Sequence, residues 1–335
     1  MSAIPPLAES LTTTKAKGND PSRCGFELCR SVLLGVKEAR AYRPDLCLKF
    51  GAHLLRSHSS ALAHELWAAY EQVYGALLNL GRYEAKKPSG ENAESDHIKR
   101  AQELLALLST QFPDSLRVKR LQGMMWESKG EYDLAAAEYD AILADDPSNL
   151  LTLKRQVAIS RSRGKLGEAV KKLIEYLQTF CSDTEAWLML QEIYLQCQQY
   201  KRAAFCVEEL ILVNPMCYIY HVRAGEITYT QGMSERGGSN ELLLSARKYF
   251  AHALELKPGN NLRALYGLLL TSSALGKASK AKGTQVDTGE LVAYVTSLLT
   301  FCYTQAAAAP PHPMRPIVMS LAKKLTASLG TAAGA

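Results

Sequence analysis

The sequence predicts an all-α protein built as a linear array of helix pairs, and three observations support this prediction. Ala, Leu, Glu and Lys, which favour helices, are abundant, whereas period-two runs of valine and isoleucine are scarce. Apolar segments end repeatedly at a proline, which cannot continue a helix interior. Ala135, Ala169 and Ala203 recur at intervals of 34 residues. Such a period indicates one supersecondary unit that is repeated because it cannot bury its apolar face alone.

The repeat is clearest in three blocks, which begin at Leu116, Leu150 and Thr184. Each block contains a break between two helical segments, and the residues at the break stand in register. These residues are Gly130, Gly164 and Gln198, followed two positions later by Tyr132, Leu166 and Tyr200. Pro147, Cys181 and Pro215 close the blocks.

This pattern resembles the tetratricopeptide repeat, a helix-turn-helix unit. The Thr184 block carries it in Trp187, Leu190, Tyr194, Tyr200, Ala203 and Pro215, and the Leu116 block in Gly123, Trp126, Tyr132, Ala135, Tyr139 and Pro147. Ala169 continues it, and Ala246, Phe250 and Pro258 extend it downstream. The resemblance implies a solenoid, a right-handed superhelix of helix pairs in which Ala203 permits close helix approach and Tyr194 fills space between repeats.

The array is expected to extend in both directions, to five or six helix pairs. We predict helices over 66–83 and 101–111 upstream, and over 261–276 and 290–305 downstream, with a loop at 277–289 and extra residues between helices at 232–240. Residues 26–60 should form an N-terminal cap. The predicted domains are a disordered tail over 1–25, the array over 26–305, an Ala/Pro-rich linker over 306–316, and a short C-terminal helical segment and tail over 317–335.

No pattern typical of catalysis, cofactor binding or metal binding is found, so we expect a protein that is not an enzyme and needs no cofactor. His53, His58 and His64 are not at the spacing of helical metal pairs. The eight cysteines form no C-x-x-C pair and are interpreted as reduced thiols. No signal peptide or membrane-spanning stretch is predicted.

Charge is unevenly distributed along the repeats. Residues 154–172 hold seven basic side chains and one acidic one, whereas residues 183–209 hold five acidic and two basic ones. The alternation fits either solvated helix faces or a groove with a basic and an acidic half. The net charge of +6 is too small to indicate a dedicated nucleic-acid binder.

In tetratricopeptide arrays the first helix of each pair lines the concave face. By that resemblance, the candidate partner-binding residues are Arg117, Arg120, Met124, Lys154, Arg161, Glu185, Leu188 and Glu192. The neighbouring positions on the same face are Glu127, Leu151, Ala158 and Leu195. This mixture suits a folded partner or peptide that presents apolar and acidic groups. The asparagines with which co-chaperones grip acidic chaperone tails are missing.

A more specific resemblance covers roughly residues 110–275. The stretches QYKRAAFCVEELILVNP, EYDLAAAEYDAILADDPSN and ARKYFAHALELKPGNNLRALYGL are similar to the ER membrane protein complex subunit 2 family. The resemblance implies a peripheral scaffold on the cytoplasmic face of the endoplasmic reticulum. Its array would hold cytosolic segments of membrane-spanning subunits and a globular cytosolic subunit, within a hetero-oligomer that inserts tail-anchored and multi-pass proteins. It implies no catalytic residues.

Three other functions stay open at this point. The chain could be a soluble tetratricopeptide co-chaperone or peptide-binding adaptor, and the missing asparagines disfavour this. It could be an RNA-processing scaffold, which the basic stretch at 154–172 supports weakly. An enzyme is the least favoured alternative.

Overall fold

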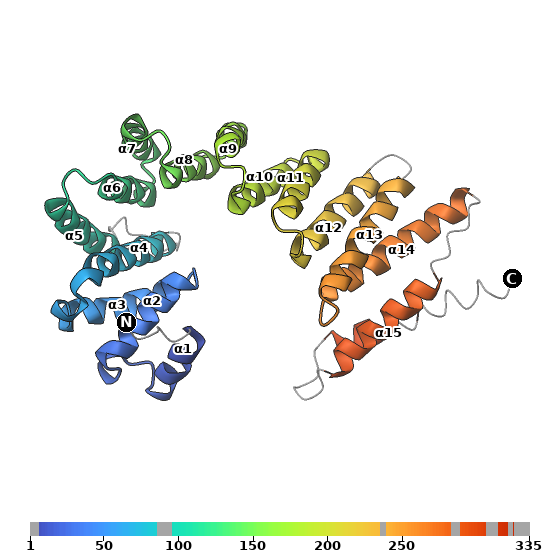
Figure 1. The fold of residues 1–335 in the computed structure, drawn as a ribbon, viewed down its shortest axis with the longest axis horizontal. Coiled ribbons are helices and arrows are strands. Elements are labelled where there is room, and N and C mark those ends of the chain that lie inside the picture. Colours follow the sequence, from blue (N-terminus) through green and yellow to red (C-terminus); the bar gives the residue numbers. More distant parts are fainter. Residues whose placement is uncertain are drawn as a thin grey trace. The chain divides into compact units, whose positions relative to one another are not determined.

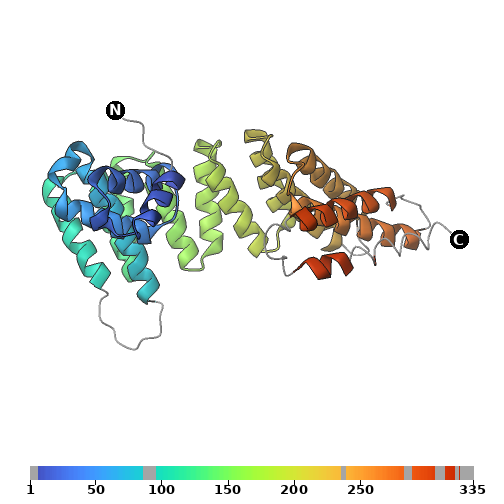
Figure 2. The same cartoon turned by 90° about the horizontal axis from the view of Figure 1, so that it is seen from below.

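The computed structural model describes residues 7–85, 96–234, 239–282, 289–305, 314–320 and 324. Throughout these residues the chain forms helices joined by turns, without a β-strand, which confirms the predicted all-α array of helix pairs. The chain divides into two compact units, Met1–Lys165 and Leu166–Ala335. Figures 1 and 2 show the successive helices of each unit packed side by side.

The first unit contains the helices α1 to α8. These are α1 (Leu7–Ala16), α2 (Phe26–Glu38), α3 (Pro44–Ser57), α4 (Leu66–Ala85), α5 (Asp96–Gln111), α6 (Leu116–Lys129), α7 (Tyr132–Asp145) and α8 (Leu150–Ser162), with 3₁₀ turns at Pro21–Arg23 and Ser60–Glu65. Each helix packs against the next along the chain, and α4 also contacts α6. Contact between the first helices of successive pairs is the arrangement that repeated helix pairs require to share a core.

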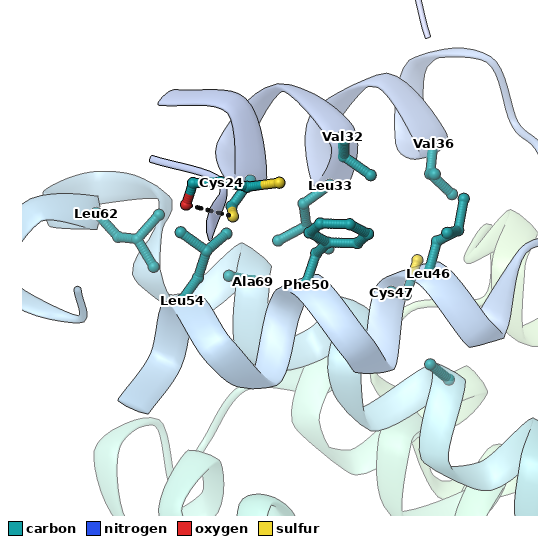
Figure 3. Packing of buried hydrophobic residues seen from close by; sticks show 12 residues of the cluster. Cys24, Val32, Leu33, Val36, Leu46, Cys47, Phe50, Leu54, Leu62 and Ala69 are labelled. Atoms are coloured by element: carbon teal, nitrogen blue, oxygen red, sulfur yellow. Dashed lines mark hydrogen bonds between the residues drawn. The ribbon is translucent and has the colours of Figure 1, made fainter. Parts of the chain in front are cut away.

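The N-terminal residues are ordered by packing, so the predicted disordered tail is wrong for residues 7–24. Leu7 of α1 lies against Gly35 of α2, and Cys24 is buried among α2 and α3 side chains. Figure 3 shows Phe50 and Leu54 of α3 in this cluster. Three consecutive threonines give α1 weak intrinsic helix propensity, which is why the sequence pattern does not reveal it. Residues 1–6 lie outside the described part of the chain.

The second unit contains the helices α9 to α15. These are α9 (Leu166–Thr179), α10 (Thr184–Gln196), α11 (Tyr200–Val213), α12 (Tyr218–Ser234), α13 (Asn240–Leu256), α14 (Leu262–Lys282) and α15 (Gly289–Gln305). Side chains of α12 to α15 form one apolar cluster around Phe250, and Val318 from the C-terminal segment joins it. Residues 315–320 are helical, so part of this segment packs back on the array.

Three predicted segments differ from the structure or fall partly outside it. The loop expected at 277–289 is wrong for residues 277–282, because α14 continues to Lys282, and residues 283–288 lie outside the described part. The extra residues expected at 232–240 are partly helical, because α12 continues to Ser234 and α13 begins at Asn240, and residues 235–238 lie outside the described part. Most of the predicted linker, residues 306–313, and residues 325–335 also lie outside it.

The turns inside the helix pairs explain the register of the repeat. Gly130, Gly164 and Gln198 all have positive φ, at 84°, 73° and 56°. The left-handed conformation lets the chain leave one helix and enter the next, and glycine adopts it without a Cβ penalty. Gln198 is the exception that adopts it with a side chain.

The small residues of the repeat lie in the core. Ala135, Ala169, Ala203 and Ala246 are fully buried. A Cβ atom added to Gly123 would lie 2.3 Å from Cε1 of Tyr139, so this ring packs directly against the backbone of α6. Close packing of this kind leaves no room for a larger side chain.

The remaining repeat positions fill the core or follow the helix ends. Trp187, Leu190 and Tyr194 are buried, and Phe250 is a buried member of the second unit's cluster. Trp126 and Tyr132 are partly buried and Tyr200 is half-buried. The prolines each come two residues after a helix: Pro147 after α7, Pro215 after α11 and Pro258 after α13.

Candidate partner-binding groove

The first unit has a hollow of about 550 Å³ between helices α2, α4, α6 and α8. Its wall is formed by Lys37, Ala68, Glu71, Gln72, Gly75, Arg117, Arg120, Leu121, Met124, Leu151, Lys154, Arg155 and Ala158. We call this hollow the basic groove, because five of these side chains are cations and Glu71 is the only carboxylate. Within the described residues no cluster of His, Cys, Asp or Glu could hold a metal ion.

The basic groove brings together four of the predicted partner-binding residues, Arg117, Arg120, Met124 and Lys154. Arg161 lies on α8 but is not part of its wall. The other predicted residues are on α10 of the second unit, where Glu185 and Glu192 are exposed and Leu188 is half-buried. Partner binding by all eight residues stays a prediction.

Glu71 contacts two arginines of the groove wall. It forms an ion pair with Arg117, and its Oε1 lies 3.5 Å from Nη2 of Arg120. The side chain of Arg120 is only 14% exposed, and burial lowers its pKa, an effect that the nearby Glu71 carboxylate opposes. Arg120 is therefore a largely desolvated cation whose carboxylate partner is shared with another arginine.

A network of polar side chains around the buried Glu127 adjoins the groove and shares Arg155 with it. Tyr139 of α7 donates a 2.6 Å hydrogen bond to Glu127 of α6, and Nη1 of Arg155 on α8 lies 3.5 Å from the other Glu127 oxygen. Glu127 is only 5% exposed, so the expectation that it faces the concave surface is wrong. Tyr74 of α4 donates a 2.7 Å hydrogen bond to the Leu121 carbonyl of α6. These bonds fix the helices that carry the groove's charged side chains.

The cap helices also contribute to the groove. Lys37 comes from α2, which is held by a two-pronged ion pair between Arg30 and Glu65, with Nη2–Oε1 and Nε–Oε2 distances of 2.5 and 2.6 Å. Hydrogen bonding to Arg30 lowers the pKa of Glu65, which keeps that carboxylate charged.

A second hollow of about 250 Å³ adjoins the basic groove and is mainly apolar. Its wall contains Trp67, Leu108, Phe112, Ser115 and Val118, and the two hollows share Ala68, Glu71, Arg117 and Leu121. The Trp67 and Phe112 rings meet edge to face, with centroids 5.2 Å apart. We call this second hollow the aromatic pocket.

Sequence reasoning missed several groove residues. Lys37 lies outside the repeats, where no register relates it to α6 or α8. Trp67 packs against the core cluster of α4 to α6 and also lines the aromatic pocket. Arg155 could have been predicted as a groove residue, because it follows Lys154 in the basic stretch at 154–172.

Comparison with known proteins places this arrangement in a family. The family model for the EMC2 TPR-like repeat domain matches residues 104–234. ER membrane protein complex subunit 2 of Xenopus tropicalis is 40% identical over 282 residues, which covers 84% of this chain and 88% of the relative. The chain belongs to the ER membrane protein complex subunit 2 family.

The family extends to distant eukaryotes, and its fold is that of other tetratricopeptide proteins. ER membrane protein complex subunit 2 of Dictyostelium discoideum is 30% identical over 259 residues, or 74% of either chain. A solved structure, the C-terminal part of a TPR repeat-containing protein from Cytophaga hutchinsonii, aligns with a TM-score of 0.51 at 13% identity. It covers 82% of this chain and 95% of that chain. The tetratricopeptide prediction is confirmed.

Membership of the subunit 2 family confirms the more specific resemblance noted in the sequence. This chain is thus a tetratricopeptide member of a family named for subunits of the ER membrane protein complex. Among the described residues, no helix combines the length and apolar character needed to cross a bilayer.

Proposed function

We propose that this chain is a non-catalytic scaffold subunit of the ER membrane protein complex, peripheral to the cytoplasmic face of the endoplasmic reticulum. The observation that carries the proposal is the 40% identity over 282 residues to a subunit 2 protein. In this function the repeat array holds cytosolic parts of membrane-spanning subunits and a soluble partner subunit. The complex inserts tail-anchored and multi-pass proteins into the membrane.

The surface of the array fits a scaffold that binds more than one partner. The basic groove of the first unit offers cations beside Met124 and Leu151, which is 51% exposed. Helix α10 of the second unit instead presents the carboxylates Glu185 and Glu192. Surfaces of different charge select different partners, because like charges facing each other disfavour the wrong complex.

The two carboxylates near the groove, Glu127 and Glu71, are engaged in structural contacts, which supports a role without catalysis. Glu127 is hydrogen-bonded by Tyr139, and Glu71 pairs with two arginines. A general acid or base requires a group that is presented to a substrate at an accessible site. The two carboxylates of the groove region serve instead to position cations.

The test is affinity purification of the tagged full-length protein from membranes solubilised in a mild detergent, with quantitative mass spectrometry. Recovery of a fixed set of membrane-spanning subunits in near-equal amounts is the expected result. Recovery of soluble chaperones alone would replace the proposal with the co-chaperone function. Recovery of proteins that disappear after ribonuclease treatment would replace it with the RNA scaffold.

A further inference from the structure

The basic groove and the aromatic pocket meet at one ion pair. Glu71 and Arg117 belong to the walls of both hollows, and their side chains contact each other at the boundary. On one side lie Lys37, Arg120, Lys154 and Arg155. On the other side lie Trp67, Leu108, Phe112 and Val118. A ligand that fills both hollows must therefore combine negative charge with an adjacent apolar group.

Glu71 occupies the place in which such a ligand's carboxylate would be best stabilised. It is the only acidic side chain in either wall, and it is 22% exposed. Arginine pairs best with a carboxylate through two parallel N–H···O bonds. Glu71 instead divides its two oxygens between Arg117 and Arg120, and its contact with Arg120 is long, at 3.5 Å. The arginines thus keep bonding capacity for a second carboxylate.

We infer that the first unit binds a segment of a partner protein in which acidic residues flank one large apolar residue, with Glu71 as an internal stand-in for a partner carboxylate. The apolar side chain enters the aromatic pocket, and the flanking carboxylates contact the cations of the basic groove. Resting on the proposed function, this inference gives the chemistry of one segment that the scaffold holds.

The pocket chemistry favours a peptide over single-stranded RNA. RNA-binding grooves combine cations with aromatic rings on which bases stack. None of the described residues that line the basic groove is aromatic, and Trp67 is half-buried with its ring against Phe112. A branched or aromatic side chain suits the Trp67 and Phe112 pocket, because the walls around it are apolar on several sides.

The test measures fluorescence anisotropy of short fluorescein-labelled peptides with the purified full-length protein. The first peptide has glutamates flanking a single leucine, the second replaces the leucine with serine, and the third replaces the glutamates with glutamines. We expect the first peptide to bind at least tenfold more tightly than either of the others. Equal binding of all three, or tighter binding of a single-stranded RNA oligonucleotide that displaces the first peptide, would overturn the inference.

Glu71→Gln provides the sharpest test, because it should increase affinity. Removing the internal carboxylate frees Arg117 and Arg120 and removes a repulsive charge, so the first peptide should bind about fivefold more tightly. Glu103→Gln is the matched control, since Glu103 is an exposed residue of α5 outside both hollows and its loss changes the net charge equally. Unchanged or weaker binding by Glu71→Gln, in protein with wild-type thermal stability, would contradict the stand-in role.

Two further variants separate the charged and apolar halves of the site. Lys37→Glu combined with Lys154→Glu should weaken the first peptide at least tenfold, whereas Lys99→Glu combined with Lys119→Glu, outside both hollows, should leave its affinity within twofold. Phe112→Ala should weaken the leucine peptide and leave the serine peptide unchanged. Equal losses in the two charge-reversal pairs would mean that attraction is non-specific and would overturn the inference.

The peptide results and the subunit recovery can fail independently. Failure of peptide discrimination with full recovery of membrane-spanning subunits would reject the groove and leave the scaffold function standing. Successful peptide discrimination without such subunits would reject the scaffold function and leave the groove's chemistry established.

Discussion

The phenol of Tyr139 and the carboxylate of Glu127 form a buried 2.6 Å hydrogen bond between α7 and α6. Arg155 of α8 pairs with the same carboxylate, so side chains from three helices interact at Glu127. Arg155 belongs both to this network and to the wall of the basic groove. The Tyr139–Glu127 bond thus holds the carboxylate that pairs with one cation of the groove.

Tyr139→Phe should destabilise the first unit without changing its shape. The substitution removes the hydrogen bond and leaves one oxygen of a 5% exposed carboxylate without its donor, at a cost of about 1–3 kcal/mol. Urea unfolding followed by circular dichroism measures the change. Tyr42→Phe is the control, because Tyr42 is 74% exposed, and an equal loss in both variants would contradict the assignment.

Gly123→Ala should destabilise the α6–α7 pair through overpacking. The added methyl group would lie 2.3 Å from the ring of Tyr139, which must then move, at a cost of about 1–3 kcal/mol. A Cβ atom added to Gly75 in α4 would meet no atom within 4 Å outside its own stretch of helix. Gly75→Ala should therefore stabilise the protein by about 0.5–1 kcal/mol. The two unfolding midpoints should therefore shift in opposite directions. A shift in the same direction would refute the close approach.

Gln198→Gly should stabilise the second unit. Gln198 has a φ of 56°, a left-handed conformation that glycine adopts without strain, so a gain of about 0.5–1 kcal/mol is expected. The reverse change at the equivalent turn, Gly130→Gln, should cost about 1 kcal/mol. Thermal melting of both variants checks the pair, and destabilisation by Gln198→Gly would argue against the shared turn geometry.

Leu210→Asp should unfold the α10–α11 region and release partner proteins. Leu210 is completely buried, and placing an unpaired carboxyl group there lowers the free energy of unfolding by a few kcal/mol, even if the group becomes protonated. Leu212→Asp, on the same helix but at a 76% exposed position, should melt as the wild type does. Melting curves and recovery of membrane subunits should separate the two variants. Wild-type behaviour of Leu210→Asp would refute the repeat register.

The repeat made most of the fold predictable, because residues 34 positions apart meet the same physical demands. Ala135, Ala169 and Ala203 show the demand for a small residue between helices. The N-terminal helix α1 obeys no such repeat and is held by tertiary packing of Leu7 and Leu11, which sequence patterns do not reveal. The length of α14 was underestimated because its last turns are rich in Lys and Ser rather than apolar residues.

The site was only partly predictable, because register identifies helix faces but does not determine which side chains remain at the surface. The tetratricopeptide resemblance predicts that Arg117, Arg120 and Lys154 share one face, and all three line the basic groove. Glu127 shares that register, yet Tyr139 and Arg155 draw its carboxylate into the interior. Lys37 comes from α2 of the N-terminal cap, whose contact with the repeats depends on how the cap packs. Glu71 comes from α4, the helix of the array that contacts α6.

The N-terminal cap has a consequence for the protein's solution behaviour. A stack of helix pairs ends in an apolar face that matches the face of the next identical pair, so an open end is a template for head-to-tail polymerisation. Helix α1 and the residues around Cys24 cover Val32, Phe50 and Leu54 at that end. We therefore expect that a protein without residues 7–24 would expose these side chains and form concentration-dependent fibres or aggregates in place of discrete particles.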